Sequence, residues 1–543
     1  MKTTRRRFLG YTAALSAASA ASWLSYRHLN PQPTIHANRV GLPLGHLLRD
    51  GRLLQQPQQT YHCNTLVLGS GAAALSAVWY LAKHGHTNLL LAEGFERNGN
   101  NAGYYTNTQG APTGAHYLAL PSKESVYIRE MLADLGILLN GADSARPVYR
   151  ETDLVYAPQE RLYYQNHWQS HLIPHDDADS RRFFAFIQRL KQARGRDGQK
   201  RFAIPIVHSS QDPDWRQLDT ITFSRWLAQQ NYRSPTLLWY LDYCCRDDYG
   251  QGSDQVSAFA GLHYFTARGH DDEAVLTWPD GLAHLSEALR RHAGLQPIEH
   301  LPDAAELSFS RPASFNASAV KIWETADHVE VWLRHNQSGK TIAVQARNVI
   351  SAMPLMVAGR ILENAASYGF QTGMPEYAPW LVANFVLHRF PPETGRSELA
   401  WDNVIYGSRG LGYVVATNQL IRTAKPEQTI FTTYDALNHD TPQNIRRWLL
   451  QASDQTLMEY ASEDLISAYG KRFLAHVGHV DITVRGHAMS VPTPGYLSRP
   501  LLLALRQHRS RISFAHSDLS GYSVFEEAAY WGVEAAKNIL SQS

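Results

Sequence analysis

The segment formed by residues 64–93 constrains the fold most strongly, because it combines an apolar strand, a glycine-rich turn, an apolar helix and a second apolar strand. Its turn reads GSGAAA and comprises Gly69, Ser70, Gly71, Ala72, Ala73 and Ala74. This is the GxGxxA variant of the dinucleotide-binding fingerprint. The segment therefore predicts a Rossmann-like unit with a nucleotide at its turn.

The small residues of the turn each have a physical reason. Gly69 permits the tight turn, and Gly71 leaves no side chain between the backbone and a pyrophosphate. Ala74 is small enough for the helix to lie close to the strand, and the free N–H groups at the helix start attract phosphate. Glu93 ends the second strand, where a ribose hydroxyl needs an acceptor, so NADP is disfavoured.

Composition excludes some classes of function. The chain has 543 residues, of which 44% are hydrophobic, enough for two large lobes. A net charge of +2 gives no reason to expect a nucleic acid partner. Cys63, Cys244 and Cys245 are too few for a disulfide framework and lack the spacing of metal ligands, so we expect no metal site. Cys244 and Cys245 are either packed or surface thiols, or a vicinal disulfide.

Residues 1–30 have the pattern of a twin-arginine signal peptide. The motif TRRRFL at residues 4–9 precedes an Ala/Ser/Leu-rich run from Tyr11 to Leu24, and small residues at 18–20 offer a cleavage site. The run is shorter than the ~20 residues of a spanning helix. We expect a periplasmic protein whose partner is the twin-arginine translocation machinery, or a membrane-anchored one if the signal stays uncleaved. A basic, frayed terminus is the alternative.

Export bears on the choice of dinucleotide. NAD is a dissociable co-substrate that needs a cytoplasmic pool, whereas FAD is held tightly enough to travel with a folded protein. The two patterns together favour FAD.

The rest of the chain divides into alternating segments of two domains, which makes the expected fold class α/β with an inserted α+β substrate domain. The expected boundaries are a linker at 31–59, the FAD-binding domain at 60–146, 272–357 and 479–543, and the substrate domain at 147–271 and 358–478. Near the C-terminus, Ser523 and Glu526 have capping-box spacing, which predicts a helix from about Val524. The start of that helix could steady negative charge on a reduced flavin ring.

These pieces resemble the FAD-dependent amine oxidase superfamily, and within it the Tat-exported spermidine dehydrogenase-like flavoproteins. The resemblance rests on the GxGxxA turn with Glu93, the strand at 349–354, the sequence WPDG at 278–281 before a helix, and FAHSD at 514–518 before the terminal helix. It implies an amine-oxidase-type, Rossmann-like FAD-binding domain, with the flavin ring at the border with the substrate domain.

The resemblance also implies roles for single residues. Gly69, Ser70, Gly71 and Ala74 would line the pyrophosphate, Glu93 would bind the adenosine ribose, and Asp518 the ribityl chain or the flavin-side phosphate. Ala72, Ala73 and Asn101 complete the candidate cofactor-binding set.

Some features depart from the family pattern. The usual Gly-Gly pair appears as NGNN at 98–101, and the Gly-Ala of the terminal helix reads Glu527-Ala528. No cysteine near the C-terminus is placed for a cysteinyl flavin, and the lysine that many amine oxidases hold over the flavin is not identifiable. Oxidase and dehydrogenase therefore both stay open, with oxygen or an electron acceptor protein as partner.

A flavin accepts hydride from a carbon next to an amine or alcohol, so the protein must orient that C–H bond and exclude water. A histidine titrating near neutral pH could take the proton of a small-molecule amine, and His116 and His487 are the candidates, with His516 as a further option. Trp278, Tyr496 and Tyr522 are candidates for an aromatic wall that binds an ammonium group.

Three functions compete. The first is an exported FAD-dependent oxidoreductase of an amine, including polyamines. The second is an FAD-dependent desaturase of an apolar lipid or isoprenoid, and the third is a non-catalytic exported flavin-binding partner protein. An apolar tunnel would favour the lipid, whereas carboxylates at the pocket would favour the amine.

Overall fold

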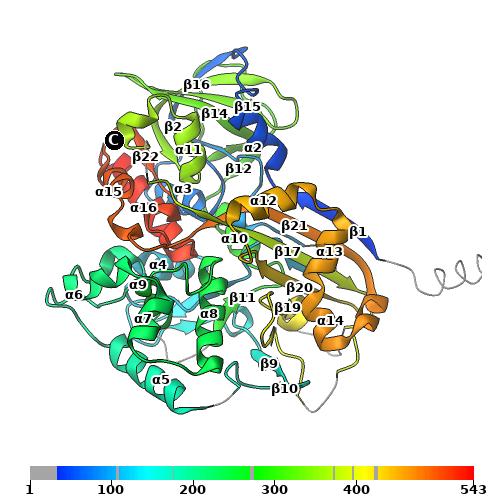
Figure 1. Cartoon of the computed structure of the whole chain (residues 1–543). Helices are drawn as coiled ribbons and strands as arrows, with labels where there is room; N and C mark the ends of the chain where they lie inside the picture. Colours follow the sequence, from blue (N-terminus) through cyan, green and yellow to red (C-terminus); the bar gives the residue numbers. More distant parts are fainter. Residues whose placement is uncertain are drawn as a thin grey trace, which may run out of the picture.

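The computed structural model describes residues 33–105, 109–174, 176–268, 274–370, 373–393, 397–420 and 426–542. Its elements form two lobes, each built around a large sheet (Figure 1). The predicted twin-arginine signal lies outside the described residues.

The first lobe contains the glycine turn at the centre of its sheet. Strand β2 pairs in parallel with β3 on one side and with β16 on the other. The strands are β2 (Thr60–Leu68), β3 (Leu89–Ala92), β12 (Gln296–Ile298), β13 (Ala313–Phe315), β14 (Ala317–Glu324), β15 (Val329–His335), β16 (Thr341–Ser351) and β22 (Ile512–Phe514). Every residue of β3 and β22 is buried, as expected for strands covered on both faces.

Helices cover this sheet. They are α3 (Ala72–Lys83), α4 (Val126–Asp134), α10 (Ala283–His292), α11 (Leu355–Ile361), α15 (Pro500–Gln507) and α16 (Phe525–Leu540). Helices α3 and α16 cross closely, because Gly532 of α16 has no side chain and a β-carbon there would overlap the carbonyl oxygen of Ala73.

The second sheet belongs to the substrate lobe. Its strands, in spatial order, are β1 (Thr34–Arg39), β21 (Val477–Ser490), β17 (Tyr377–Leu387), β20 (Thr429–Ala436), β19 (Tyr413–Val415), β18 (Asp402–Ile405), β9 (Glu160–Tyr164) and β10 (His167–Gln169). Helices α12 (Pro442–Gln451), α13 (Asp454–Ala461) and α14 (Glu463–Tyr469) lie over one face of it (Figure 1).

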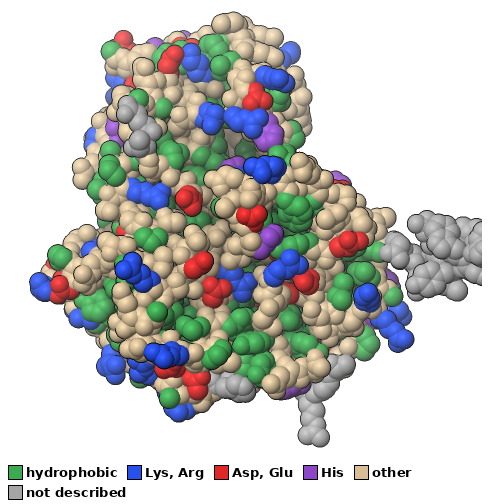
Figure 2. Space-filling model, viewed as in Figure 1, with side chains coloured by type: hydrophobic (Ala, Val, Ile, Leu, Met, Phe, Trp, Pro, Cys, Tyr) green, Lys and Arg blue, Asp and Glu red, His purple; other side chains and the backbone are tan. Residues whose placement is uncertain are grey.

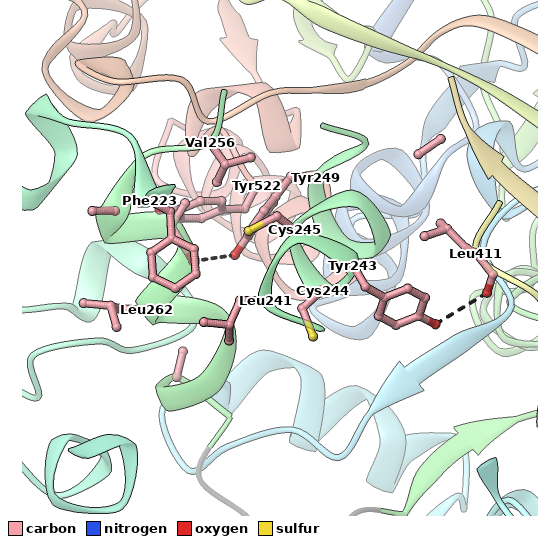
Figure 3. Close-up of a cluster of buried hydrophobic side chains, with 14 of the residues drawn as sticks. Phe223, Leu241, Tyr243, Cys244, Cys245, Tyr249, Val256, Leu262, Leu411 and Tyr522 are labelled. Atoms are coloured by element: carbon pink, nitrogen blue, oxygen red, sulfur yellow. Dashed lines mark hydrogen bonds between the residues drawn. The ribbon is translucent and has the colours of Figure 1, made fainter. Parts of the chain in front are cut away.

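A helical subdomain completes this lobe. It consists of α5 (Ala178–Lys191), α6 (Pro213–Arg216), α7 (Phe223–Gln229), α8 (Pro235–Tyr249) and α9 (Ala258–Thr266). Its apolar core surrounds α8 (Figure 3). Cys244 and Cys245 are free, buried thiols whose sulfur atoms point to different sides of this helix (Figure 3), so the vicinal disulfide is not formed. Packing accounts for both residues.

Three short antiparallel ribbons lie outside the two sheets. They pair β4 (Gly103–Tyr105) with β5 (Gly110–Pro112), β6 (Tyr117–Ala119) with β11 (Val275–Thr277), and β7 (Leu138–Asn140) with β8 (Val148–Tyr149). The ribbon of β6 and β11 brings the chain entering and leaving the inserted segment side by side.

The segment predicted to be a linker is partly structured. It contains β1 and helix α2 (Leu42–Arg49), and β1 forms the edge of the second sheet by pairing in parallel with β21. Arg39 adds a 3.1 Å ion pair to Asp454 of α13. The linker interpretation failed because the hydrogen-bonding partner of β1 lies near the other end of the chain, where no local pattern reveals it.

The predicted capping box is also wrong, although the helix starts within one residue of the expected position. Helix α16 begins at Phe525 and its N-cap residue, Val524, provides no side-chain cap. The hydroxyl oxygen of Ser523 instead accepts a 3.0 Å hydrogen bond from the amide of Ser490. Ser523 therefore makes a hydrogen bond to a distant strand instead of capping its own helix.

The surface offers no single-sign patch on the face shown in Figure 2, where acidic and basic side chains are interspersed. Within the described ranges, no helix is both long and apolar enough to cross a bilayer. Nor do the described residues contain a group of three or more His, Cys, Asp or Glu suited to a metal ion.

Candidate functional site

The glycine turn leaves open space in front of α3. The amide of Gly69 donates to the carbonyl of Ala92 over 2.9 Å, and Gly69 has a φ of 106°, which favours glycine. A β-carbon on Gly71 would have no heavy atom within 4 Å. Helix α3 starts at Ala72 with no side-chain cap from Gly71, so its first N–H groups face this space. Open volume beside free backbone donors fits a phosphate group.

The other residues of the glycine turn hold its backbone in place through hydrogen bonds and packing. The hydroxyl of Ser70 donates to the carbonyl oxygens of Glu93 and Glu96, at 2.7 and 3.0 Å, and so ties the turn to the segment that follows β3. Ala73 and Ala74 are buried in the contact between α3, the sheet and α16. They shape the turn through packing.

Glu93 is held by an arginine that sequence analysis did not identify. Arg290 of α10 donates two 2.7 Å hydrogen bonds to the two carboxylate oxygens of Glu93, and both side chains are buried. The Nε of Arg290 donates to Asn98 over 2.8 Å, and Asn98 in turn donates to Glu287. This bidentate geometry fixes the orientation of the Glu93 carboxylate.

Asn101 and Asp518 are both buried. Asn101 donates a 3.3 Å hydrogen bond to Ser286 of α10. Oδ2 of Asp518 accepts from the amide of Leu355 at 2.9 Å and from Tyr377 at 2.6 Å. Burial raises the pKa of Asp518, but His516 and these hydrogen bonds outweigh it, so its pKa lies below the usual value. Asp518 is therefore an ionised framework residue, and its contact with a cofactor stays a prediction.

Four aromatic rings meet where the two lobes join. His116 stacks on Tyr434 of β20 with 4.4 Å between ring centroids, and lies 4.9 Å from Tyr117 and 5.5 Å from Trp401. Tyr117 and Trp401 meet edge to face at 6.1 Å. The hydroxyl of Tyr434 donates to the carbonyl of Gly114 over 3.1 Å, which anchors the second sheet to the chain that follows the glycine turn.

A carboxyl group from α8 reaches the same place. Oδ2 of Asp247 lies 3.4 Å from the hydroxyl of Tyr117. Burial and the neighbouring Asp248 raise the pKa of Asp247 to about 7, against the opposing effects of Tyr117 and Arg268. Asp247 therefore exchanges its proton near neutral pH.

A second carboxyl group comes from the first residue of β18. Burial, Asp247 and Glu160 raise the pKa of Asp402 well above its usual value. Burial raises the pKa of Tyr434 well above its usual value, and the negative charges of Asp402 and Asp247 raise it further. We call the set formed by His116, Tyr117, Trp401, Tyr434, Asp247 and Asp402 the border cluster.

The two catalytic histidine candidates lie in different surroundings. His116 belongs to the border cluster, where burial lowers its pKa to about 3, so it is neutral at pH 7 and a weak base. This corrects the expectation of a histidine that titrates near neutrality. His487 lies on β21 at an exposed position, and its ring centroid is 6.2 Å from that of Tyr377.

The three residues expected to form an aromatic wall do not lie together. Trp278 donates to Asp153 over 3.0 Å and stacks on His284, whereas Tyr496 donates to the carbonyl of Asp518 over 2.9 Å. Tyr522 packs against His263, with 4.8 Å between ring centroids. Each belongs to a different apolar core, so core packing explains their positions.

Buried ionic contacts connect the substrate lobe to α16. Arg268 lies 3.5 Å from Asp248 and 3.6 Å from Glu526. Glu527, which replaces the glycine of the family pattern, accepts hydrogen bonds from the amide of Ile206 and the hydroxyl of Ser520, at 2.6 and 2.5 Å. Burial raises the pKa of Glu527 to about 7. The departure from glycine thus attaches the start of α16 to the inserted lobe.

Sequence analysis missed Arg290, Asp247, Asp402, Trp401 and Tyr434. One signal was available for Asp247, because the sequence CCRDDY places charged residues within an otherwise apolar helix. The others had no local signal, since pairing between distant strands brings them to the site.

Comparison with known proteins places this geometry in a known fold. No family model and no curated protein matches the chain. Putrescine oxidase, solved as the wild type bound to putrescine, aligns with a TM-score of 0.61 and 14% identity, over 89% of this chain and 100% of that chain. Cyclohexylamine oxidase from Brevibacterium oxydans aligns with a TM-score of 0.56 and 16% identity, over 88% and 99%. This chain has the amine oxidase fold.

The expected fold class, a Rossmann-like domain with an inserted substrate domain, is therefore confirmed. The same fold includes a CLA-producing fatty acid isomerase from P. acnes, with a TM-score of 0.57 and 14% identity over 87% of this chain and 97% of that one. The fold thus accommodates both amine and fatty acid substrates, and the residues of the site must decide between them.

Proposed function

We propose that the protein is an exported FAD-dependent oxidoreductase of the amine oxidase type, which removes hydride from the carbon next to the nitrogen of an amine, with polyamines among its substrates. Bound FAD supplies the hydride acceptor. The substrate lobe binds and orients the amine at the border cluster.

The geometry of the first lobe supports FAD as the cofactor. The space above Gly71 and the free N–H groups of α3 suit the pyrophosphate, and the Glu93 carboxylate stands ready to accept from a ribose hydroxyl. Putrescine oxidase, which shares this fold, has been the subject of a redesign of cofactor binding.

The observation that carries the choice of substrate is the pair of half-buried carboxyl groups in the border cluster. Asp247 and Asp402 lie among aromatic rings that can contact a cation through their faces, an interaction worth about 0.5 to 2 kcal/mol per ring. An ammonium group satisfies two acidic groups in a way that an apolar chain cannot. These carboxyl groups therefore favour an amine over a lipid.

The same cluster offers a proton acceptor. An amine must lose its ammonium proton before the adjacent C–H bond gives up hydride, and an effective base has a pKa near the working pH. Asp247 meets this condition at about 7, whereas His116, at about 3, does not. We assign proton acceptance to Asp247 and a packing role to His116, which holds Tyr117 and Tyr434 in place.

Turnover of a panel of mono-, di- and polyamines with an artificial electron acceptor tests this function. The wild type should oxidise at least one amine, and Asp247→Asn should lower kcat/KM about 100-fold or more, the scale of a lost general base. Asp327→Asn, an exposed change on the hairpin between β14 and β15, is the matched control and should leave the rate unchanged. Equal rates in wild type and Asp247→Asn would refute the assigned role.

A second candidate, oxidation or desaturation of an apolar lipid, is favoured by one observation, the shared fold of the fatty acid isomerase. If turnover occurs with a fatty acid or isoprenoid and with no amine, this candidate replaces the first. If no donor of either kind reduces a bound flavin, the third function, a non-catalytic flavin-binding partner, gains support.

Export is the remaining part of the proposal. The TRRRFL motif supports passage through the twin-arginine route with FAD already bound. Changing Arg5 and Arg6 together to lysine should retain the protein in the cytoplasm, as judged by fractionation of expressing cells. Unchanged periplasmic recovery of this variant would contradict the proposal.

A further inference from the structure

A cavity of about 220 Å³ lies between helix α4, residues 205–208 of the inserted segment and the first two turns of α16. Figure 1 shows α4 next to α16, on the side of the helical subdomain. The cavity shares no residue with the border cluster or with the glycine turn. The side chains that line it are mostly apolar or aromatic and include Val126, Tyr127, Ile128, Pro205 and Tyr530.

Hydrogen bonds hold the three walls of the cavity together. The hydroxyl of Ser125, the residue before α4, donates to the carbonyl of Ile204 over 2.8 Å. The amide of Ile206 donates to the Glu527 carboxyl group of α16 over 2.6 Å. These bonds join α4, the inserted segment and α16, so a ligand meets walls that are already in place and does not have to order them.

Three aromatic rings shape the cavity. Tyr127 and Tyr530 stack with 5.8 Å between ring centroids and 23° between their planes. His208 meets Tyr530 edge to face at 5.6 Å. Such rings offer faces and edges against which a further aromatic ring packs. A cavity of about 150 Å³ accommodates benzene, so this larger one has room for a single ring with one substituent.

The charges at the cavity are balanced without a ligand. The carboxyl groups that line it belong to Glu124 and Glu526. Glu124 lies 3.6 Å from Lys200, and Glu526 lies 3.6 Å from Arg268. Desolvation lowers the pKa of His208, so that its ring is neutral at pH 7. A neutral ligand therefore suits this cavity better than a charged one.

One polar side chain at the cavity has an unused hydrogen-bond acceptor. Glu526 is 1% exposed, and its Oε1 has no hydrogen-bond partner among the described residues. Its separation of 3.6 Å from Nε of Arg268 is too long for a hydrogen bond. Because a buried acceptor without a partner is costly, a donor that reaches it gains affinity. A matching ligand therefore carries an O–H or N–H group.

We propose that this cavity is a binding site for a neutral single-ring aromatic molecule with one hydrogen-bond donor, the chemistry of a phenol. The ring lies against Tyr530, and the hydroxyl group donates to Glu526. Binding is reversible and non-covalent. The site goes beyond the proposed function, and its test does not depend on amine turnover.

Titration of the full chain with its bound cofactor, followed by ligand-detected NMR, tests the choice of ligand. Phenol is compared with toluene, which has nearly the same shape but a methyl group in place of the hydroxyl group. Phenol should bind about tenfold more tightly than toluene, the scale of one hydrogen bond to a carboxyl group. Equal affinities, or no binding of phenol at millimolar concentration, would overturn the proposal.

Two exposed valines locate the binding site. Val126 is 57% exposed and lines the cavity, whereas Val148 is 53% exposed and lies on β8, outside it. Val126→Trp places a large ring at the cavity and should weaken phenol binding about tenfold or more. Val148→Trp is the matched control and should bind phenol as the wild type does. Unchanged phenol affinity in Val126→Trp would place the ligand elsewhere and contradict the proposal.

Glu526→Met tests the hydrogen bond. The change removes the acceptor and keeps the length of the side chain, while Arg268 keeps its 3.5 Å contact with Asp248. This variant should bind toluene as the wild type does, and phenol no more tightly than toluene. An unchanged far-ultraviolet circular dichroism spectrum establishes its fold, and the two valine variants decide the question if it does not fold. A preference for phenol that persists in folded Glu526→Met would refute the role of Glu526.

Discussion

At the scale of single residues, the pairing of buried charges shapes the site. Glu93 was predictable from its position after β3, because the dinucleotide fingerprint fixes where the acidic residue lies. Arg290 was not predictable, because it follows two consecutive turns of an ordinary amphipathic helix and meets Glu93 only in the folded chain. The ion pair means that Glu93 is oriented before any ligand arrives.

Arg290→Ala should therefore be strongly destabilising. It leaves the Glu93 carboxylate buried without its partner, at a cost of about 3 to 5 kcal/mol in the free energy of unfolding. Arg97→Ala removes an exposed arginine that pairs with Glu287 in the same network, and should cost at most about 1 kcal/mol. Urea denaturation measures both values, and equal losses would contradict a special role for Arg290.

At the scale of elements, α16 connects the two lobes through its first turn and its crossing with α3. The helix was well predicted because its apolar periodicity is local. The contacts of its start were not, since Ser523 bonds to β21 and Glu527 bonds to the segment before α6, both distant in sequence. The buried contacts of Glu527 make the stability contributed by α16 depend on pH.

Glu527 should make the protein less stable as pH rises. Its folded pKa of about 7 lies above its ordinary value of 4.5, so the folded state holds the proton more tightly than the unfolded state does. The stabilisation is present below about pH 4.5 and is lost as pH rises to about 7. Raising the pH from 4 to 8 should therefore lower the free energy of unfolding of the wild type by about 3 kcal/mol relative to that of Glu527→Gln.

Urea denaturation at the two pH values measures this difference. Glu299→Gln, a change at an exposed position after β12, provides the control and should show no such difference. A pH-independent difference between Glu527→Gln and the wild type would show that the pKa of Glu527 is the same in the folded and unfolded states, and would contradict this prediction.

The crossing of α3 and α16 gives a second prediction at this scale. Gly532→Ala places a β-carbon against the carbonyl oxygen of Ala73 and should cost about 1 to 3 kcal/mol by forcing the helices apart. Gly45→Ala in α2 meets no heavy atom within 4 Å and should instead stabilise by about 0.5 to 1 kcal/mol. Thermal unfolding should shift in opposite directions for the two variants, and a neutral Gly532→Ala would contradict the close crossing.

At the scale of the whole molecule, the sequence reveals the nucleotide lobe better than the substrate lobe. The turn, α3 and β3 form one contiguous unit whose pattern is local. The border cluster instead depends on β18 lying parallel to β9 and on β20 reaching the chain after the glycine turn. Such pairing follows from long-range packing, for which single residues such as Asp402 and Trp401 carry no sequence signal.

The same reasoning explains why the sequence around β1 predicts a linker. Its side chains are only partly buried, and its stability comes from backbone pairing with β21. The domain boundaries around it stay a prediction. The chain passes back and forth between the two lobes, so both lobes contribute residues to the border cluster. The proposed function requires such an arrangement, because the amine must be held beside the flavin.

The measurement that tests the central claim most directly is the visible absorbance spectrum of the purified protein during anaerobic addition of an amine panel. The account predicts a yellow protein whose flavin absorbance bleaches with at least one amine and returns on admission of air or an added acceptor. A colourless protein that cannot take up FAD, or a bound flavin that stays oxidised with every amine, would contradict it.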